Sequence, residues 1–214
     1  TAGTAKFETT PAALAGFEKL EDGFKNGWWQ EDFGATKFPD ALNMLIDGKI
    51  AQYPTASFSI GVIAGIHPAA LENIGFFWIP RDYAAKNCAT FWMPSATYLT
   101  QTSKNAAAAK DFLAFIASVD GANAEAAALP PSGPFMIKGA NLPDNAAPAV
   151  KENAAYLTDG KAVPALEFQS PLKGPSLEQI TVAVGSGLNS AQEGAALYDQ
   201  DVEKQAKQLG LPGW

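Results

Sequence analysis

Apolar side chains recur at helical spacing near the start of the chain. They follow one another at steps of three or four residues: Leu14, Phe17, Leu20 and Phe24. Thr10 and Pro11 precede them, as an N-cap residue and a proline at the first helical position. The pattern predicts an amphipathic helix over residues 11–25.

The same periodicity predicts further helices along the chain. They cover residues 39–46, 105–117, 146–157, 176–184 and 190–208. The clearest is 105–117, which presents one apolar face made by Ala109, Phe112, Leu113 and Ile116. Ser190 is the expected N-cap of the last helix.

Other segments predict extended structure. The stretch "MLIDGKIAQYPTASFSIG", residues 44–61, leaves a helix at Gly48 and continues in small, β-branched and aromatic residues, which predicts a strand. Residues 73–80 fit a buried strand, and residues 90–103 fit an extended segment interrupted by Pro94. Residues 128–137, "ALPPSGPFMI", form a rigid proline-rich loop. Strands alternating with helices, without a tandem repeat, predict an α/β layered fold.

Two aromatic residues stand among small or polar neighbours instead of aliphatic ones. Ser57 and Ser59 flank Phe58, and Pro94 and Ser95 follow Trp92. Sugars are held by stacking on an aromatic face while hydrogen bonds fix their hydroxyl groups. We therefore expect Phe58 and Trp92 to contact a carbohydrate, and core packing is the alternative for each.

Composition narrows the function. The 22 acidic and 15 basic residues give a net charge of −7, and no basic stripe is present, which argues against nucleic acid as a partner. One cysteine, Cys88, and one histidine, His67, exclude an internal disulfide and predict no metal site. No apolar run approaches the roughly 20 residues of a membrane span. Only 17% of residues are charged, which suits an exported protein that binds neutral polar ligands.

Catalytic motifs are missing. His67 precedes Pro68 in an apolar turn, no G-x-S-x-G elbow occurs, and no second histidine would activate Cys88. We predict no enzyme, no catalytic residue and no cofactor. The alternative is a glycosidase that uses two carboxylates, for which the candidates are Asp22, Glu31, Asp32 and Glu167.

Segments in a fixed order carry a family resemblance. They read "ALNMLIDGKIAQYPTASFSIG", "ENIGFFWIP", "TYLTQTSKNAAAAKDFLAFIAS", "LPPSGPFMI" and "SGLNSAQEGAALYDQDVEKQAKQLGLPGW". In this order they resemble the C-terminal half of the extracellular solute-binding proteins of sugar ABC transporters, the maltose-binding-protein type. The likeness covers almost the whole chain.

The resemblance implies a fold and a division into domains. The fold is a periplasmic-binding-protein-like type II lobe, a mixed sheet flanked by helices. Residues 1–96 and 130–214 would form the C-terminal lobe. Residues 97–129 would be a strand-helix segment that completes an N-terminal lobe, most of which precedes this chain.

The resemblance also implies a site. Gln52, Ala56 and Phe58 match a family motif in which Phe58 replaces a ligand-stacking tryptophan. The segment after Trp92 resembles the crossover between lobes, and residues 168–176 resemble a loop that reaches the ligand. The expected ligand-binding residues are Ser57, Phe58, Trp92, Pro94, Ser95, Gln169 and Ser170.

The implied function is the substrate-binding component of an ABC importer. It would bind a mono- or oligosaccharide between two lobes, outside the cell or in the periplasm, and deliver it to the transmembrane subunits of a permease. Membrane contact would come only through the permease or through an N-terminal lipid anchor. A non-transport surface carbohydrate-binding module is a further alternative.

Overall fold

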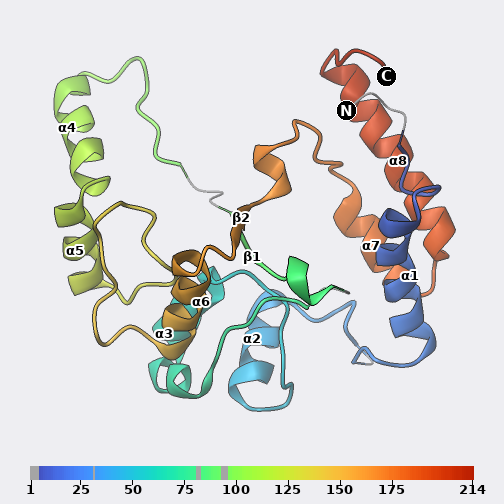
Figure 1. Cartoon of the computed structure of the whole chain (residues 1–214), viewed down its shortest axis with the longest axis horizontal. Helices are drawn as coiled ribbons and strands as arrows, with labels where there is room; N and C mark the ends of the chain where they lie inside the picture. The colour runs from blue at the N-terminus through green and yellow to red at the C-terminus, as the bar shows by residue number, and fades with distance from the viewer. Residues whose placement is uncertain (1–4, 31, 81–82, 93–95) are drawn as a thin grey trace. The chain divides into compact units, whose positions relative to one another are not determined.

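The computed structural model describes residues 5–30, 32–80, 83–92 and 96–214. The chain is a helix-rich α/β protein that divides into two compact units (Figure 1). Unit 1 contains residues 1–37 and 166–214, and unit 2 contains residues 38–165.

Unit 1 is a helical body. Helices α1 (Pro11–Lys25), α7 (Leu177–Gly185) and α8 (Ala191–Gln208) lie side by side (Figure 1). A 3₁₀ turn, η3 (Leu166–Phe168), precedes α7 in the chain. Phe17 from α1 packs near Tyr198 from α8, with ring centroids 6.4 Å apart. The buried core of the unit comprises Phe17, Ile180, Val184, Ala191, Ala195, Tyr198 and Val202.

Glycine and carboxylate positions explain how α8 packs so closely. A Cβ added at Gly194 would clash with Val184, so the glycine allows α8 to approach α7. Asp199 accepts hydrogen bonds from the backbone N–H groups of Phe7 and Glu8, at 2.8 and 3.0 Å. Asp201 accepts from the N–H and the hydroxyl of Ser176, at 2.9 and 3.0 Å. Polar side chains of α8 thereby fix two loops.

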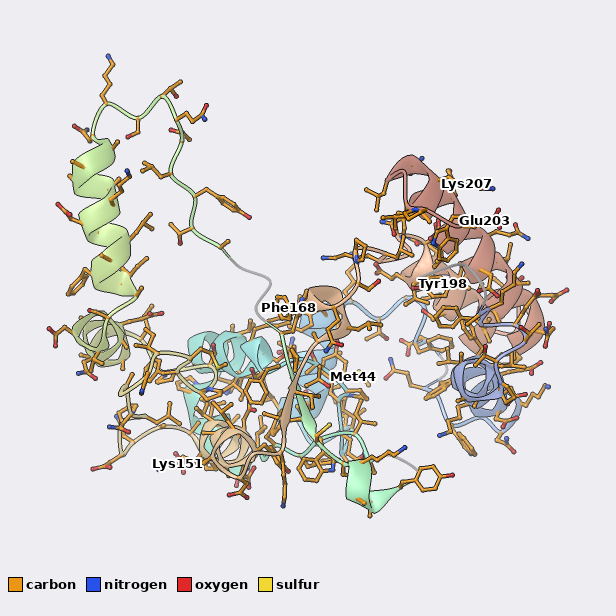
Figure 2. All side chains as sticks on the ribbon, turned by 45° about the horizontal axis from the view of Figure 1, so that its top comes forward. Met44, Lys151, Phe168, Tyr198, Glu203 and Lys207 are labelled. Carbon is orange, nitrogen blue, oxygen red and sulfur yellow. The ribbon has the colours of Figure 1, made fainter. Side chains whose placement is uncertain are left out.

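The exposed side of α8 is charged. Lys207 donates a hydrogen bond to Glu203 one turn earlier (Figure 2). This hydrogen bond, and the charge of Lys207, hold the pKa of the Glu203 carboxyl below its ordinary value. An exposed pair of this kind contributes little to the stability of a helix, because water and salt screen the charges.

Unit 2 combines short helices with a two-stranded sheet. Its elements are α2 (Phe38–Ile46), α3 (Phe58–Ile66), η1 (Pro68–Asn73), η2 (Ala84–Lys86), β1 (Ala89–Phe91), α4 (Ala106–Ile116), α5 (Val119–Ala128), α6 (Pro148–Thr158) and β2 (Ala162–Pro164). Its core comprises Leu42, Ile60, Ile63, Leu71, Ala146, Ala149 and Val150. Strands β1 and β2 pair in parallel, with Ala89 opposite Ala162 and Phe91 opposite Pro164.

The predicted helices are confirmed, and α5 was not predicted. The strand predicted up to Gly61 is wrong, because α3 begins at Phe58. Ile60 and Ile63 are 5% and 1% exposed, three residues apart on one helical face, and both belong to the core around Leu42. Phenylalanine, isoleucine and valine favour extended structure locally, but burial of this face favours the helix.

The segment predicted as a buried strand over 73–80 pairs with no described strand. Its burial still alternates: Phe76 and Trp78 are half-buried, whereas Phe77 and Ile79 are exposed. The rings of Phe76 and Trp78 pack on Tyr156, at centroid distances of 5.8 and 4.1 Å. The segment thus has the side-chain period of a strand without a sheet neighbour. Of the extended segment predicted over 90–103, only Thr90 and Phe91 lie in β1.

Helix α4 is confirmed, but it buries no residue. Ala109, Leu113 and Ile116 are half-buried, and α4 contacts α5. Phe112 and Phe115 are 61% and 46% exposed. The assignment of residues 97–129 to another lobe stays a prediction.

Candidate functional site

Phe58 is an exposed aromatic residue at the start of α3, a partly buried helix. Its side chain is 52% exposed, although Ser59 and Ile60 beside it are buried. The ring rests against Phe38, with centroids 5.5 Å apart. The rest of the ring is open to a ligand.

The hydroxyl groups near Phe58 differ in their use. Ser59 is 4% exposed, and its hydroxyl lies 3.0 Å from that of Thr55, so these two groups satisfy each other. Ser57 is half-buried at the N-cap of α3 and makes no side-chain cap hydrogen bond. Ser57 is therefore the hydroxyl beside Phe58 that remains suited to a ligand.

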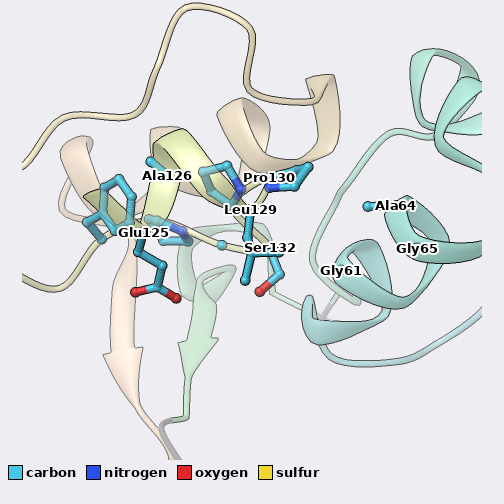
Figure 3. A pocket seen from close by; sticks show the side chains of 12 residues that line it. Gly61, Ala64, Gly65, Glu125, Ala126, Leu129, Pro130 and Ser132 are labelled. Carbon is cyan, nitrogen blue, oxygen red and sulfur yellow. The ribbon is translucent and has the colours of Figure 1, made fainter. Parts of the chain in front are cut away.

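A pocket of about 610 Å³ lies within unit 2, next to this position (Figure 3). One wall is the small-residue face of α3, formed by Gly61, Ala64 and Gly65. The opposite wall is the end of α5 and the proline-rich loop, residues 125–126 and 129–135. Its volume is within the range of small-molecule sites, roughly 300–1,000 Å³.

Close backbone packing joins Ser57 to this pocket. A Cβ added at Gly133, which lines the pocket, would lie 3.3 Å from Ser57 Oγ. A Cβ added at Gly61 would lie 3.1 Å from Ser132 Cβ. The loop thus packs against the first turns of α3 and brings the pocket beside Ser57.

The pocket is mainly apolar. Glu125 is the only charged residue among the described residues that line it, and Ser132 adds a hydroxyl. The described residues contain no group of three or more histidine, cysteine and carboxylate side chains suited to a metal ion. The arrangement therefore offers shape, C–H surface and hydrogen bonds, and the described lining has no paired acid and base.

The remaining predicted ligand residues belong to both units. Trp92 is 46% exposed and follows β1 in unit 2. Pro94 and Ser95 lie outside the described residues, as does Glu31 of the glycosidase alternative. Gln169 and Ser170 lie in unit 1 after η3. Gln169 is exposed, whereas the Ser170 hydroxyl forms a local turn with the N–H of Leu172, at 3.2 Å.

The pocket residues were not predicted as a site. The signal available in the sequence is the spacing of Gly61, Ala64 and Gly65, which places small residues on one face of a helix. Because this segment is predicted as a strand, the helical spacing of these small residues is not recognised from the sequence. The proline-rich loop was recognised as rigid, but its sequence does not say which helix it contacts.

No protein-family model matches the chain, and no curated protein matches it. Among the helices of the described residues, none combines the length and the hydropathy that a membrane span requires.

Proposed function

We propose that the chain is part of the carbohydrate-binding component of an ABC importer, with a periplasmic-binding-protein-like type II fold. It binds a mono- or oligosaccharide outside the membrane, in the extracellular space or the periplasm, and presents it to the permease subunits. It catalyses no reaction. The observation that carries the proposal is the exposed ring of Phe58 next in sequence to Ser57, whose hydroxyl lies close to Gly133 of the pocket lining.

An exposed phenyl ring leaves apolar area in contact with water and offers a surface on which a ligand can stack. A single exposed apolar side chain is ordinary on a protein surface. Phe58 differs because it follows Ser57, whose hydroxyl makes no cap hydrogen bond and lies close to Gly133 of a pocket of ligand size. Stacking a pyranose C–H face on the ring removes apolar area from water, and the hydroxyl fixes orientation.

The transport signal in this proposal is closure of two lobes. A sugar that contacts both lobes binds the closed state more tightly than the open one, and so shifts the population toward closure. Further contacts to the sugar would then come from the other lobe. On its own, this chain is expected to bind sugar with a Kd on the order of 1 mM, because contacts from the other lobe would not contribute.

Substitution of the ring tests the proposal. Saturation-transfer NMR with millimolar maltotriose, cellotriose and xylotriose is expected to detect binding by the wild-type chain. Phe58→Ala removes an aromatic contact worth about 1–3 kcal/mol, so the Kd of the bound sugar should rise about fivefold or more. The matched control is Phe77→Ala, a ring in the same unit that is 56% exposed and should not change binding.

Three results contradict the proposal. The first is wild-type binding to none of these sugars. The second is the same affinity for Phe58→Ala and Phe77→Ala. The third is sugar cleavage beyond one equivalent, which would favour the glycosidase. Melting temperatures of both variants close to that of the wild type show that the losses concern binding.

A further inference from the structure

The wall of the pocket on α3 has free space at one position. A Cβ added at Gly65 would meet no atom within 4 Å, whereas one added at Gly61 would touch Ser132. Both glycines line the pocket together with Ala64. The cavity therefore opens toward the end of α3, where only small residues face it.

The opposite wall of the pocket is rigid and presents both apolar and polar groups. Pro130, Pro131 and Pro134 fix the loop backbone and present C–H groups. Figure 3 shows the carboxylate of Glu125 and the hydroxyl of Ser132 turned to the same side. A preformed wall of this kind reduces the entropy that a ligand loses on binding.

These groups specify the chemistry of the occupant. A carboxylate only accepts hydrogen bonds, so Glu125 suits a ligand with O–H donors. Its negative charge disfavours an acidic ligand, and the described lining holds no positive charge to compensate for one. Prolines and small aliphatic residues suit C–H surface. A neutral sugar ring supplies both O–H groups and C–H faces.

We infer that the pocket between α3 and the proline-rich loop holds a neutral sugar ring whose hydroxyls donate to Glu125. The inference rests on the proposed function and deepens it in two ways. It places a sugar unit in the pocket beyond the ring that stacks on Phe58, and it makes Glu125 a residue that selects neutral sugars over acidic ones.

The first test fills the pocket without disturbing the core. Gly65→Leu places a side chain in the open space, and it should raise the Kd of the bound neutral trisaccharide at least roughly tenfold by steric exclusion. Leucine favours a helix over glycine, so the melting temperature should stay equal or rise. Gly16→Leu is the matched control, an exposed glycine within α1 whose added Cβ also meets nothing within 4 Å, and it should leave the Kd unchanged.

The second test changes the charge. Trigalacturonic acid should bind the wild-type chain more weakly than the neutral trisaccharide. Two unit charges about 5 Å apart in water repel enough to change a Kd roughly threefold to fivefold, so Glu125→Gln should improve binding of the acidic sugar by that factor at low salt. The improvement should disappear near 1 M salt. Glu72 is an exposed residue in the same unit and outside the pocket lining, so Glu72→Gln should not change the Kd of the acidic sugar.

The outcomes separate this inference from the proposed function. If the wild type binds a neutral sugar and Phe58→Ala weakens binding, while Gly65→Leu and Glu125→Gln behave as wild type, the pocket inference is overturned and the function stands. If Gly65→Leu weakens binding and Phe58→Ala does not, the pocket holds the sugar and the stacking role of Phe58 fails. Tighter binding of trigalacturonic acid than of neutral sugars, or binding of an apolar peptide and no sugar, overturns the inference.

Discussion

The two units use similar residues for different purposes. In unit 1, Phe17 is 5% exposed and packs near Phe7 and Tyr198, with both centroid distances at 6.4 Å. In unit 2, Phe58 is 52% exposed and has Phe38 as a ring neighbour. The same side chain thus supports the fold in one unit and remains open to solvent in the other.

The helix caps show the same difference. Ser190 begins α8 with a complete capping box, in which its hydroxyl accepts from the N–H of Glu193 and the Glu193 carboxylate accepts from the N–H of Ser190. Ser57 begins α3 and makes no such bond. Unit 1 uses its polar groups to fix its backbone, whereas unit 2 leaves a hydroxyl and a ring together beside a pocket. The exposed Phe58 ring and the Ser57 hydroxyl, which makes no cap hydrogen bond, are the reason for placing the candidate site in unit 2.

The largest expected effect separates the two phenylalanines. Phe17→Ala should lower the free energy of unfolding by about 3–5 kcal/mol, because it leaves a cavity between α1 and α8. Phe58→Ala should lower it by less than about 1 kcal/mol, because the ring is half exposed already. Urea unfolding, with hydrogen exchange to assign the loss to a unit, measures both. Equal losses would remove the contrast on which the candidate site rests.

A smaller effect separates the two serines. Ser190→Ala should destabilise the protein by about 1 kcal/mol, since it removes a cap acceptor at the start of α8. Ser57→Ala should cost only a few tenths of a kcal/mol, as expected for a surface change that breaks no bond. Thermal unfolding gives the comparison. A loss for Ser57→Ala as large as that for Ser190→Ala would show that Ser57 caps α3 and is not held ready for a ligand.

The smallest effect is a dependence on pH in unit 1. The backbone hydrogen bond from Ser190, and then its hydroxyl, lower the pKa of the Glu193 carboxyl from its ordinary value of 4.5. A lowered folded-state pKa gives stability that is present above pH 4.5 and is lost as the pH falls through the folded-state pKa. Glu193→Gln should therefore be less stable than the wild type at neutral pH and equal to it in strong acid.

The control for this pH effect is the double variant. In a Ser190→Ala background, Glu193→Gln should cost less than it does alone, because one of its two bonds is already gone. Urea unfolding across the acidic range measures all four proteins. A constant difference between Glu193→Gln and the wild type at every pH would mean that the carboxylate charge plays no part in the cap.

The helices that were predicted correctly share a local cause. Residues 11–25 and 190–208 carry apolar periodicity, which acts within a few residues along the chain. Ser190 adds a capping box at the start of α8, whereas Thr10 makes no side-chain cap hydrogen bond at the start of α1. Helix α5 was missed because its sequence, "VDGANAEAAA", contains almost no large apolar residue. Ser118 nevertheless caps it, and its hydroxyl accepts from the N–H of Gly121 at 3.1 Å.

The candidate site was predicted in part. The prominence of Phe58 and Ser57 was evident from their neighbours in the sequence, since small and polar residues around an aromatic ring argue for exposure. The pocket was not predicted, because its walls come from residues 61–65 and 125–135, which lie about sixty residues apart in the sequence. A contact of that range depends on how α5 and the proline-rich loop return to α3.

Local signals along the sequence are enough to predict most of the helices, to exclude a disulfide within the chain and to find the aromatic residues that lack aliphatic neighbours. The conformation of residues 58–66, and the surface that they form, depends on tertiary contacts. The physical reason is that Ile60 and Ile63 gain their burial from Leu42, Leu71 and Val150, which belong to other elements. That gain exceeds the local preference of the segment for extended structure, and the resulting helix turns Gly61, Ala64 and Gly65 toward the pocket.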